Sequence, residues 1–573
     1  MIGAQPCGAT PIADLGGLSA YHLAMAASFV QRSSLFLAAE IEVYAPGGAI
    51  VLSPAGIGSR PVADLQQLAV QASAETLRAS DVGYRTSAAD RGGVQVYDGR
   101  IATAYALDRA IDLDPAQPAK GVSWGSLSLS NADARFDGYV TARNNDSRPV
   151  RMLMGRKTLD TQRGLWLDPA YSDLVPFWAG VASPWLLTDT TLQIPLRDAS
   201  YLLERTVQQS TFGGTGGLDG TTDLAGKCVP VLRGTCLAIT PVLVDPVDYI
   251  YRVSDGPISG VTLYVGGDSM NFSYAGDVAD ATAQQPAPGT YLTSNAQGLI
   301  RLGSKPILAV TVDATGAFLA AGPVPTLLAI ARTLMTENLG LDPTLVDYSS
   351  WLGADAAYPY RSGAFYGTTP ANGAAALSAL LASIGAKLVP LRTGRLAVLV
   401  LRALPPGLRA ATTWGTAQIV SLVPQALPAT LDPPPYRWRV GYQQVLTVQT
   451  SSFDPDVTLA QQQFLGAEYR YATAISLTTK QAYRSPNDPS PLPTALARQA
   501  DAQAVANDLL ALWGQRRRLY TVEVPIEVGI QQEIGGVVIL SYPIDDLRGG
   551  RAGQIVGESF QSTDATIKFP VLV

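Results

Sequence analysis

Hydrophobic and polar residues alternate along much of this chain in the short runs typical of β-strands. Residues 123–131 (SWGSLSLSN) and 437–449 (RWRVGYQQVLTVQ) follow the alternation of a half-buried strand. Further β-prone runs cover residues 93–107, 150–154, 177–182, 191–196, 237–244, 249–253, 261–265, 307–312, 395–401, 520–528 and 536–542. Because loops rich in Asn, Asp, Gly and Pro separate these runs, the pattern predicts β-sandwiches or barrels.

A second, helical periodicity interrupts the β pattern. It predicts helices at residues 20–32, 63–80, 320–337, 371–384 and 495–513. In the third of these, Pro323 and Pro325 are expected in the first turn, where a missing N–H costs least. Residues 35–53 instead predict two strands around a turn at 46–48.

The length and the change of pattern along the chain predict several domains. The chain has 573 residues, with 54 glycines and 40 prolines, which fits a turn-rich β protein. We expect an N-terminal mixed α/β adaptor at 1–92 and a first β domain with loop insertions at 93–319. An α/β insert domain at 320–408 and a second β domain with a long helix at 409–573 follow. The predicted fold class is therefore multidomain and mainly β, with an α/β insert.

Composition and charge exclude several classes of function. Charged residues make up only 15% of the chain, the net charge is −6, and no basic block marks a nucleic-acid footprint. The single histidine, His22, restricts a Ser-His-Asp triad to its own neighbourhood and excludes an HExxH zinc site. Three cysteines, Cys7, Cys228 and Cys236, without a CxxC pair argue against a disulfide framework or structural zinc. We expect synthesis in a reducing cytoplasm without a signal peptide, and no membrane insertion.

Candidate chemical sites are few, and each has a simpler structural explanation. The glycine stretch 213–220 has its third glycine one position late for a dinucleotide fingerprint, so a surface loop is expected. The acidic pairs Asp112/Asp114 and Asp454/Asp456 lack the rest of a calcium loop and fit turns. The arginines at 516–518 suit the end of a helix. We therefore predict no catalytic, cofactor-binding or metal-binding residue, and no enzyme.

Aromatic residues gather in two regions of the sequence. They are Trp166, Tyr171, Phe177, Trp178 and Trp185 in the first region, and Tyr348, Trp351, Tyr358, Tyr360, Phe365 and Tyr366 in the second. Tyrosine and tryptophan are enriched at protein interfaces and also line carbohydrate sites. Core packing is the commoner role of any single aromatic residue.

Several segments, in their order along the chain, resemble tail proteins of long-tailed bacteriophages. They are residues 125–133 (GSLSLSNAD), 192–199 (LQIPLRDA), 226–234 (GKCVPVLRG), 239–246 (ITPVLVDP) and 249–258 (YIYRVSDGPI). Residues 382–386 and 392–396 resemble the insert domain of tail-tip hub proteins. Residues 534–543 (IGGVVILSYP) and 549–557 (GGRAGQIVG) resemble the closing β-hairpin of those hubs. The resemblance covers residues 93–573.

The resemblance implies a structural virion protein at the tail tip or baseplate. Such a hub is a homotrimer whose two tube-like β domains per chain form a pseudo-sixfold ring. The ring joins the sixfold tail tube to a threefold central fibre or spike and forms part of the DNA ejection conduit. Expected partners are the distal tail protein, the tape measure and the central fibre, without stable nucleic-acid binding. The alternatives are a receptor- or carbohydrate-binding tail-tip protein, a distal-tail ring protein, and a cell-wall hydrolase, for which no motif is present.

Overall fold

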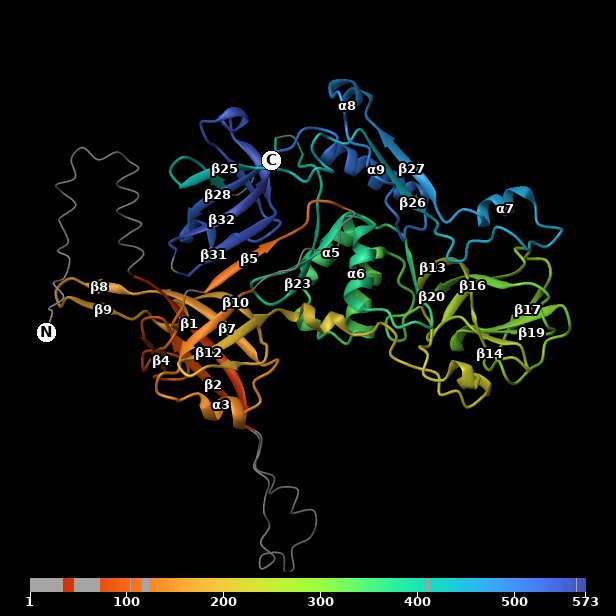
Figure 1. Cartoon of the computed structure of the whole chain (residues 1–573), viewed down its shortest axis with the longest axis horizontal. Helices are drawn as coiled ribbons and strands as arrows, with labels where there is room; N and C mark the ends of the chain where they lie inside the picture. Colours follow the sequence, from red (N-terminus) through yellow and green to blue (C-terminus); the bar gives the residue numbers. More distant parts are fainter. Residues whose placement is uncertain are drawn as a thin grey trace, which may run out of the picture.

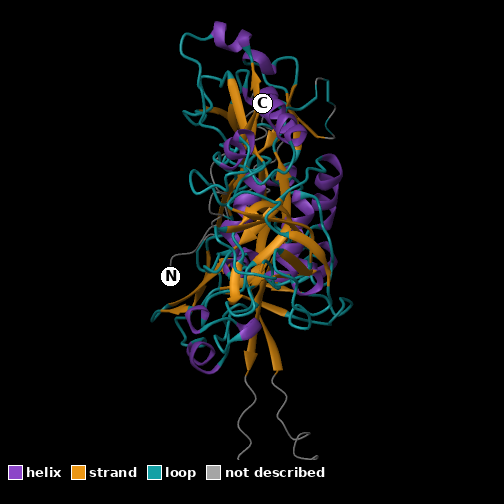
Figure 2. Ribbon diagram, turned by 90° about the vertical axis from the view of Figure 1, so that its right-hand side faces the viewer, coloured by secondary structure: helices purple, strands orange, loops and turns teal. Residues whose placement is uncertain are grey.

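The protein is mainly β and built from several sheets with helices between them (Figures 1 and 2). The computed structural model describes residues 34–45, 73–103, 105–115 and 124–573, apart from 406, 409, 411 and 563. The predicted helix at 20–32, the turn at 46–48, Cys7 and His22 lie outside the described residues. The predicted multidomain, mainly β fold is confirmed.

The first sheet has nine strands in the order β11-β12-β10-β7-β1-β2-β4-β3, with β6 paired to β12. These are β1 (Leu35–Ala45), β2 (Ser73–Ser80), β3 (Tyr84–Arg85), β4 (Val96–Gly99), β6 (Ser126–Ser130), β7 (Pro149–Arg156), β10 (Val175–Ala182), β11 (Leu186–Leu187) and β12 (Thr191–Arg197). A short helix, α3 (Asp137–Ala142), lies at one end of the sheet (Figure 1). The expected boundary at residue 92 falls within this sheet, between β3 and β4.

The helix predicted over 63–80 is wrong for residues 73–80, which form β2. β1 pairs antiparallel along the whole of β2, from Ala38 opposite Ser80 to Ala45 opposite Ser73. Leu77 and Ala79 face the core at 6% and 1% exposure, the alternate spacing of a strand. Pairing with a buried neighbour therefore overrides the helix preference of this Ala- and Leu-rich segment.

The C-terminal sheet takes one of its strands from the N-terminal part of the chain. Its strands are β5 (Ala106–Ala110), β24 (Thr412–Trp414), β25 (Ser421–Gln425), β28 (Leu519–Pro525), β29 (Val537–Leu540), β30 (Arg551–Ile555), β31 (Gly557–Gln561) and β32 (Thr566–Leu572). β5 pairs antiparallel with β31, and β29 with β30. The core of this sheet continues into the first sheet, where the rings of Phe177 and Phe560 lie 4.8 Å apart.

Two further sheets pack together at the other end of the molecule (Figure 1). One contains β13 (Val231–Ile239), β16 (Ile258–Val265), β20 (Val310–Gly316) and β21 (Gly363–Tyr366). The other contains β14 (Val242–Asp245), β15 (Ile250–Arg252), β17 (Ser273–Asp277), β18 (Thr290–Ser294) and β19 (Leu299–Leu302). Leu232, Val253, Ile300 and Val312, each fully buried, belong to the core that both sheets share.

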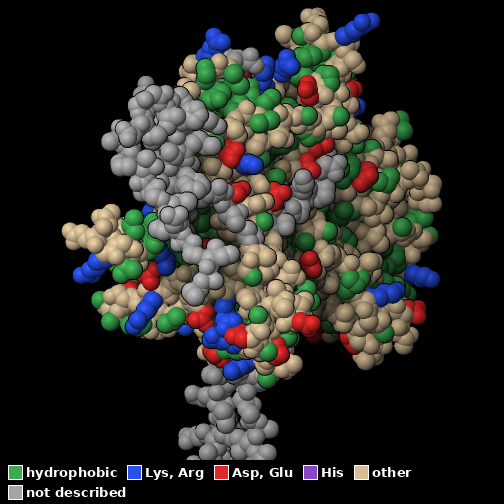
Figure 3. Space-filling view, turned by 60° about the vertical axis from the view of Figure 1, so that its left-hand side comes forward, with side chains coloured by type: hydrophobic (Ala, Val, Ile, Leu, Met, Phe, Trp, Pro, Cys, Tyr) green, Lys and Arg blue, Asp and Glu red, His purple; other side chains and the backbone are tan. Residues whose placement is uncertain are grey.

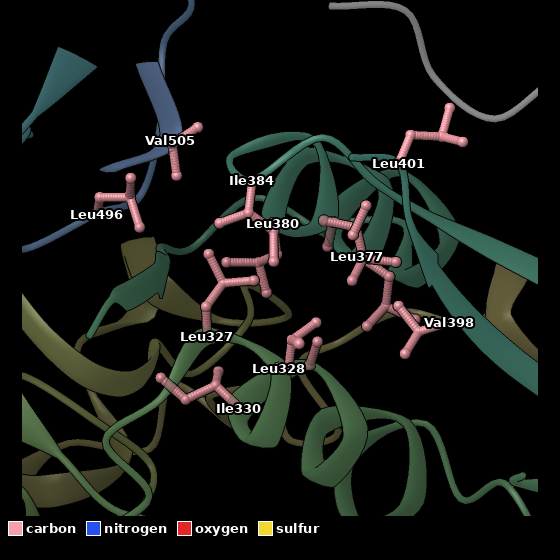
Figure 4. Close-up of a cluster of buried hydrophobic side chains, with 14 of the residues drawn as sticks. Leu327, Leu328, Ile330, Leu377, Leu380, Ile384, Val398, Leu401, Leu496 and Val505 are labelled. Carbon is pink, nitrogen blue, oxygen red and sulfur yellow. The ribbon is translucent and has the colours of Figure 1, made fainter. Parts of the chain in front are cut away.

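Helices occupy the centre of the molecule between these β units. They are α4 (Leu327–Thr333), α5 (Tyr348–Ala357) and α6 (Gly373–Ala382), with the hairpin β22 (Ala386–Pro390)–β23 (Leu396–Val400) beside them. α9 (Gln499–Trp513) packs on β26 (Arg437–Tyr442) and β27 (Arg470–Ile475). Leu328, Leu377, Leu380 and Val505 from these helices meet in one core (Figure 4).

The predicted helix at 320–337 begins later than expected, at Leu327. The carboxylate of Glu337 accepts the backbone N–H groups of Ala320 and Ala321, and a bridge between Phe318 and Gly322 tightens the turn. These contacts hold the segment in a non-helical path, so both prolines precede the helix. The helical turn then continues past Thr333 as a π-helix to Asn338.

Candidate functional site

Of the eleven aromatic residues that the sequence groups together, four are buried, five are partly buried and two are exposed. Phe177, Trp178 and Trp351 are at most 1% exposed, and Trp185 is 6% exposed. The expected aromatic surface therefore reduces to Trp166 at 44% exposure and Tyr348 at 40%. In the second region, the guanidinium carbon of Arg332 lies 5.7 Å from the centre of the Tyr348 ring. In the first region, Trp166 is the exposed aromatic residue and is open to a partner.

Trp166 lies on a two-stranded hairpin that projects beyond the first sheet (Figure 1). We call it the projecting hairpin; it comprises β8 (Thr158–Asp160), the turn 161–164 and β9 (Leu165–Leu167). It exposes four large hydrophobic side chains, which are Leu159, Leu165, Trp166 and Leu167 at 44–58% exposure. Leu159 and Trp166 are cross-strand neighbours on one face, and Leu165 and Leu167 lie on the other. Exposed apolar side chains gathered on one element are typical of a protein-contact surface.

The turn of the projecting hairpin is closed by the carboxylate of Asp160. Its Oδ1 accepts the backbone N–H groups of Gln162 and Arg163, at 3.0 and 3.2 Å. The N–H of Gly164 donates to the carbonyl of Asp160 at 2.8 Å, and Gly164 has φ 64°, which a side chain would disfavour. The sequence Asp-Thr-Gln-Arg-Gly thus encodes a tight turn that keeps both short strands in register.

Polar contacts fix the base of the projecting hairpin to the sheet. The Lys157 ammonium lies 2.9 Å from a carboxylate oxygen of Asp168 and donates to the carbonyl of Gly83 at 2.6 Å. Asp168 also accepts the N–H of Arg85, and the Tyr84 hydroxyl donates to the Pro169 carbonyl. These contacts join both legs to the edge strand β3, so the hairpin is held in one direction.

A partly buried carboxylate, that of Glu40, holds the segment that follows the hairpin. Glu40 Oε1 accepts the hydroxyls of Tyr97 at 2.6 Å and Tyr171 at 3.0 Å. Burial, followed by the contact with Glu40, raises the pKa of both tyrosines, which therefore remain neutral donors. The arrangement orients the chain between β9 and β10.

Four charged side chains, three of them buried and one partly exposed, form an ion cluster where the first sheet, the C-terminal sheet and the central hairpin meet. They are Arg109, Arg392, Glu533 and Glu558. Arg109 Nη2 lies 2.6 Å from Glu558 Oε2 and 2.7 Å from Glu533 Oε2, while its Nη1 donates to the Pro390 carbonyl. Burial alone lowers the pKa of Arg109, but Glu558 and Glu533 more than offset this and raise it. Every charge is paired, so the cluster joins segments and is not a reactive site.

The remaining candidates of the sequence analysis fall into turns, helix ends and core. The 213–220 stretch is a loop in which Asp219 accepts the N–H of Gly213. Asp112 and Asp454 each accept the N–H of the residue two positions on. Arg517 Nε donates to the Leu512 carbonyl at 2.7 Å, as expected for a helix end. Cys228 and Cys236 are buried free thiols.

Within the part of the chain that the structure describes, no cluster of three His, Cys, Asp or Glu side chains is arranged to hold a metal ion. None of its helices combines the length and the apolar character needed to span a bilayer. On the face drawn in Figure 3, basic and acidic side chains lie intermingled.

No family model matches the chain, and no curated protein matches it. Among solved structures it is similar to a prophage MuSo2 43 kDa tail protein from Shewanella oneidensis, with 9% identity and a TM-score of 0.30 over 84% of this chain and 95% of that one. It is similar to a tail protein from Neisseria meningitidis MC58, with 9% identity and a TM-score of 0.32 over 86% and 96%. A chain in the virion of a native gene transfer agent particle shows 16% identity and a TM-score of 0.32 over 65% and 92%.

Proposed function

We propose that this protein is a structural component of a phage tail, the homotrimeric hub at the distal end of the tail tube. In this role it joins the sixfold tube to a threefold central fibre or spike and forms part of the conduit for DNA ejection. Its partners are the distal tail protein, the tape measure and the central fibre. It acts through assembly within the virion and carries out no catalysis.

The observation that carries this proposal is the projecting hairpin. An isolated pair of short strands is only marginally stable in water. This hairpin in addition exposes Leu159, Leu165, Trp166 and Leu167, which a partner could bury. Burying one such side chain contributes about 1.5–3 kcal/mol. An element anchored at its base and apolar along its length suits insertion into a neighbouring subunit of an assembly.

The first sheet and the C-terminal sheet are held together by strand pairing and ion pairs, as a rigid ring subunit requires. β5 inserts into the C-terminal sheet, and the ion cluster fastens β5, β31 and the loop after β22 together. A division at residues 319 and 408 would give each chain two tube-like β bodies, the first of which includes β1, β2 and β3 because they belong to its sheet. Opening of the conduit would then be a shift of packed interfaces between discrete arrangements.

The test is the oligomeric mass of the purified full chain, measured by light scattering and by negative-stain microscopy. The proposal expects a ring-shaped trimer. A sixfold ring would instead identify a distal-tail ring protein. A monomer that still fails to trimerise when mixed with its neighbouring tail proteins, and that binds polysaccharide, would replace the hub by a carbohydrate-binding role.

A further inference from the structure

A cavity of about 450 Å³ lies between the β13 sheet, helix α6 and the chain segments 443–446 and 493–497. Cys236, Tyr366, Ala379, Gln443 and Tyr469 are among its lining residues. Leu380 and Leu496, labelled in Figure 4, form part of its wall on the side of the central core. Ala379 is exposed, so the cavity opens to solvent beside α6. Its volume falls in the range of small-molecule sites.

Unusual backbone conformations shape this cavity. The pairing of β13 with β20 is irregular between Cys236 and Ile239, and within that bulge Ala238 has φ 50°. Across the cavity Gln443 has φ 48°. Left-handed backbone at a residue other than glycine is strained and is concentrated at functional sites. Gln443 lines the cavity, and Ala238 directly follows the lining residues 235–237.

The lining decides which ligands fit. No Lys, Arg, His, Asp or Glu side chain lines the cavity, so a charged ligand would lose its hydration without gaining an ionic partner. The hydroxyls of Tyr366 and Tyr469 and the side-chain amide of Gln443 have no hydrogen-bond partner among the described residues. Burial raises the pKa of Tyr469 to about 12, so its hydroxyl stays protonated at neutral pH. The cavity thus offers apolar walls and neutral hydrogen-bond donors.

We propose that this cavity binds a small uncharged molecule that has an aromatic or aliphatic body and a hydrogen-bond-accepting oxygen. The apolar wall from Phe365, Leu380 and Leu446 would bury the body of the ligand. A hydroxyl of Tyr366 or Tyr469, or the Gln443 amide, would donate to its oxygen. The site is independent of the projecting hairpin, which lies on the first sheet.

The binding test uses the full chain and the neutral aromatic ketone prodan, whose emission shifts to the blue in an apolar site. Saturable binding of one prodan per chain is expected. Ala379→Phe fills the cavity and should weaken binding at least about tenfold. Ala375→Phe is the matched control, because Ala375 is exposed on the same helix and does not line the cavity. Absence of saturable binding, or equal binding by Ala379→Phe and the wild type, overturns the proposal.

Two further measurements cover the case in which Ala379→Phe does not fold. Tyr469→Phe removes one donor and should weaken prodan binding about twofold to tenfold, the effect of one hydrogen bond. Benzophenone, itself a neutral aromatic ketone, should photolabel peptides that contain residues 363–366, 376–383 or 443–446. Labelling confined to other peptides would overturn the proposed site even if prodan binds.

Discussion

Arg109 and Glu558 are 449 residues apart in the sequence, yet Arg109 Nη2 and Glu558 Oε2 lie 2.6 Å apart. Both side chains are fully buried. Arg109 belongs to β5 and Glu558 to β31, and these two neighbouring strands pair directly in the C-terminal sheet. The pair therefore joins the early part of the chain to its late part by both backbone and side-chain contacts.

We expect removal of one partner of this pair to be strongly destabilising. Glu558→Gln leaves Arg109 and Arg392 with a buried, uncompensated charge and should lower the free energy of unfolding by about 3–5 kcal/mol. Urea unfolding followed by circular dichroism measures the change. Arg143→Ala, which breaks the half-exposed pair with Glu75, is the control and should cost less than about 1 kcal/mol. Equal losses in the two variants would contradict the structural role of the cluster.

Polar substitutions on the projecting hairpin should impair assembly and leave the fold intact. The double variant Leu165→Asp/Trp166→Asp removes two exposed apolar contacts and should weaken self-association or docking at least about 100-fold. Sedimentation velocity measures association, and the melting temperature should change little because neither side chain is in the core. Gln162→Ala, in the turn of the same hairpin, is the matched control. Unchanged association in the double variant would remove the hairpin from the proposed interface.

Alanine substitutions at two glycines distinguish the cost of a strained backbone from the cost of a steric clash at the new Cβ atom. Gly234 and Gly260 have φ of 69° and 60°, so alanine is strained at both, by about 1–2 kcal/mol. A Cβ on Gly234 would lie 2.2 Å from the carbonyl oxygen of Ser362, whereas nothing lies within 4 Å at Gly260. Gly234→Ala should therefore be the more destabilising, by a further 1–3 kcal/mol or so. Thermal unfolding of the two variants tests the difference, and equal values would contradict the tight contact of β13 with β21.

Acid should weaken one surface contact in a defined pH range. Hydrogen bonding to Arg100, at 2.9 and 2.6 Å, lowers the pKa of Asp133 from 3.8 to about 2. Since the folded-state pKa is depressed, its contribution is complete above the unfolded value of 3.8 and is lost as the pH falls toward 2. The stability difference between wild type and Asp133→Asn, measured by urea unfolding, should be constant from pH 5 to 7 and shrink below pH 4. A difference that persists unchanged at pH 2 would contradict this pairing.

Short β-prone runs between turn residues were enough to predict many of the strands but not their partners. The runs at 150–154, 177–182 and 191–196 form β7, β10 and β12. Residues 73–80 show where this fails, since pairing with β1 decides their conformation. The local pattern at residues 320–326 predicts a helix. The contacts of Glu337 that hold this segment in another conformation are tertiary, so the pattern does not reveal them.

The candidate sites were harder to predict because their residues are brought together by tertiary structure. Arg109, Arg392, Glu533 and Glu558 share no motif or spacing, and only the fold brings them together. The aromatic clustering in the sequence did not separate buried Trp178 from exposed Trp166. One usable signal for the hairpin was present, the Leu-Trp-Leu run that directly follows Asp160 to Gly164, whose residues favour a turn.

The pairing of β5 with β31, a strand that is made late, has a consequence for synthesis of the protein. At about 5–20 residues per second, Glu558 is made roughly 20–90 s after Arg109. Until then β5 has no strand to pair with, and its buried arginine has no counter-charge. An interrupted chain therefore keeps an open strand edge and an unpaired cation, which chaperones and proteases can recognise. The pairing of β5 with β31 thus makes completion of translation a condition for the native fold of the C-terminal sheet.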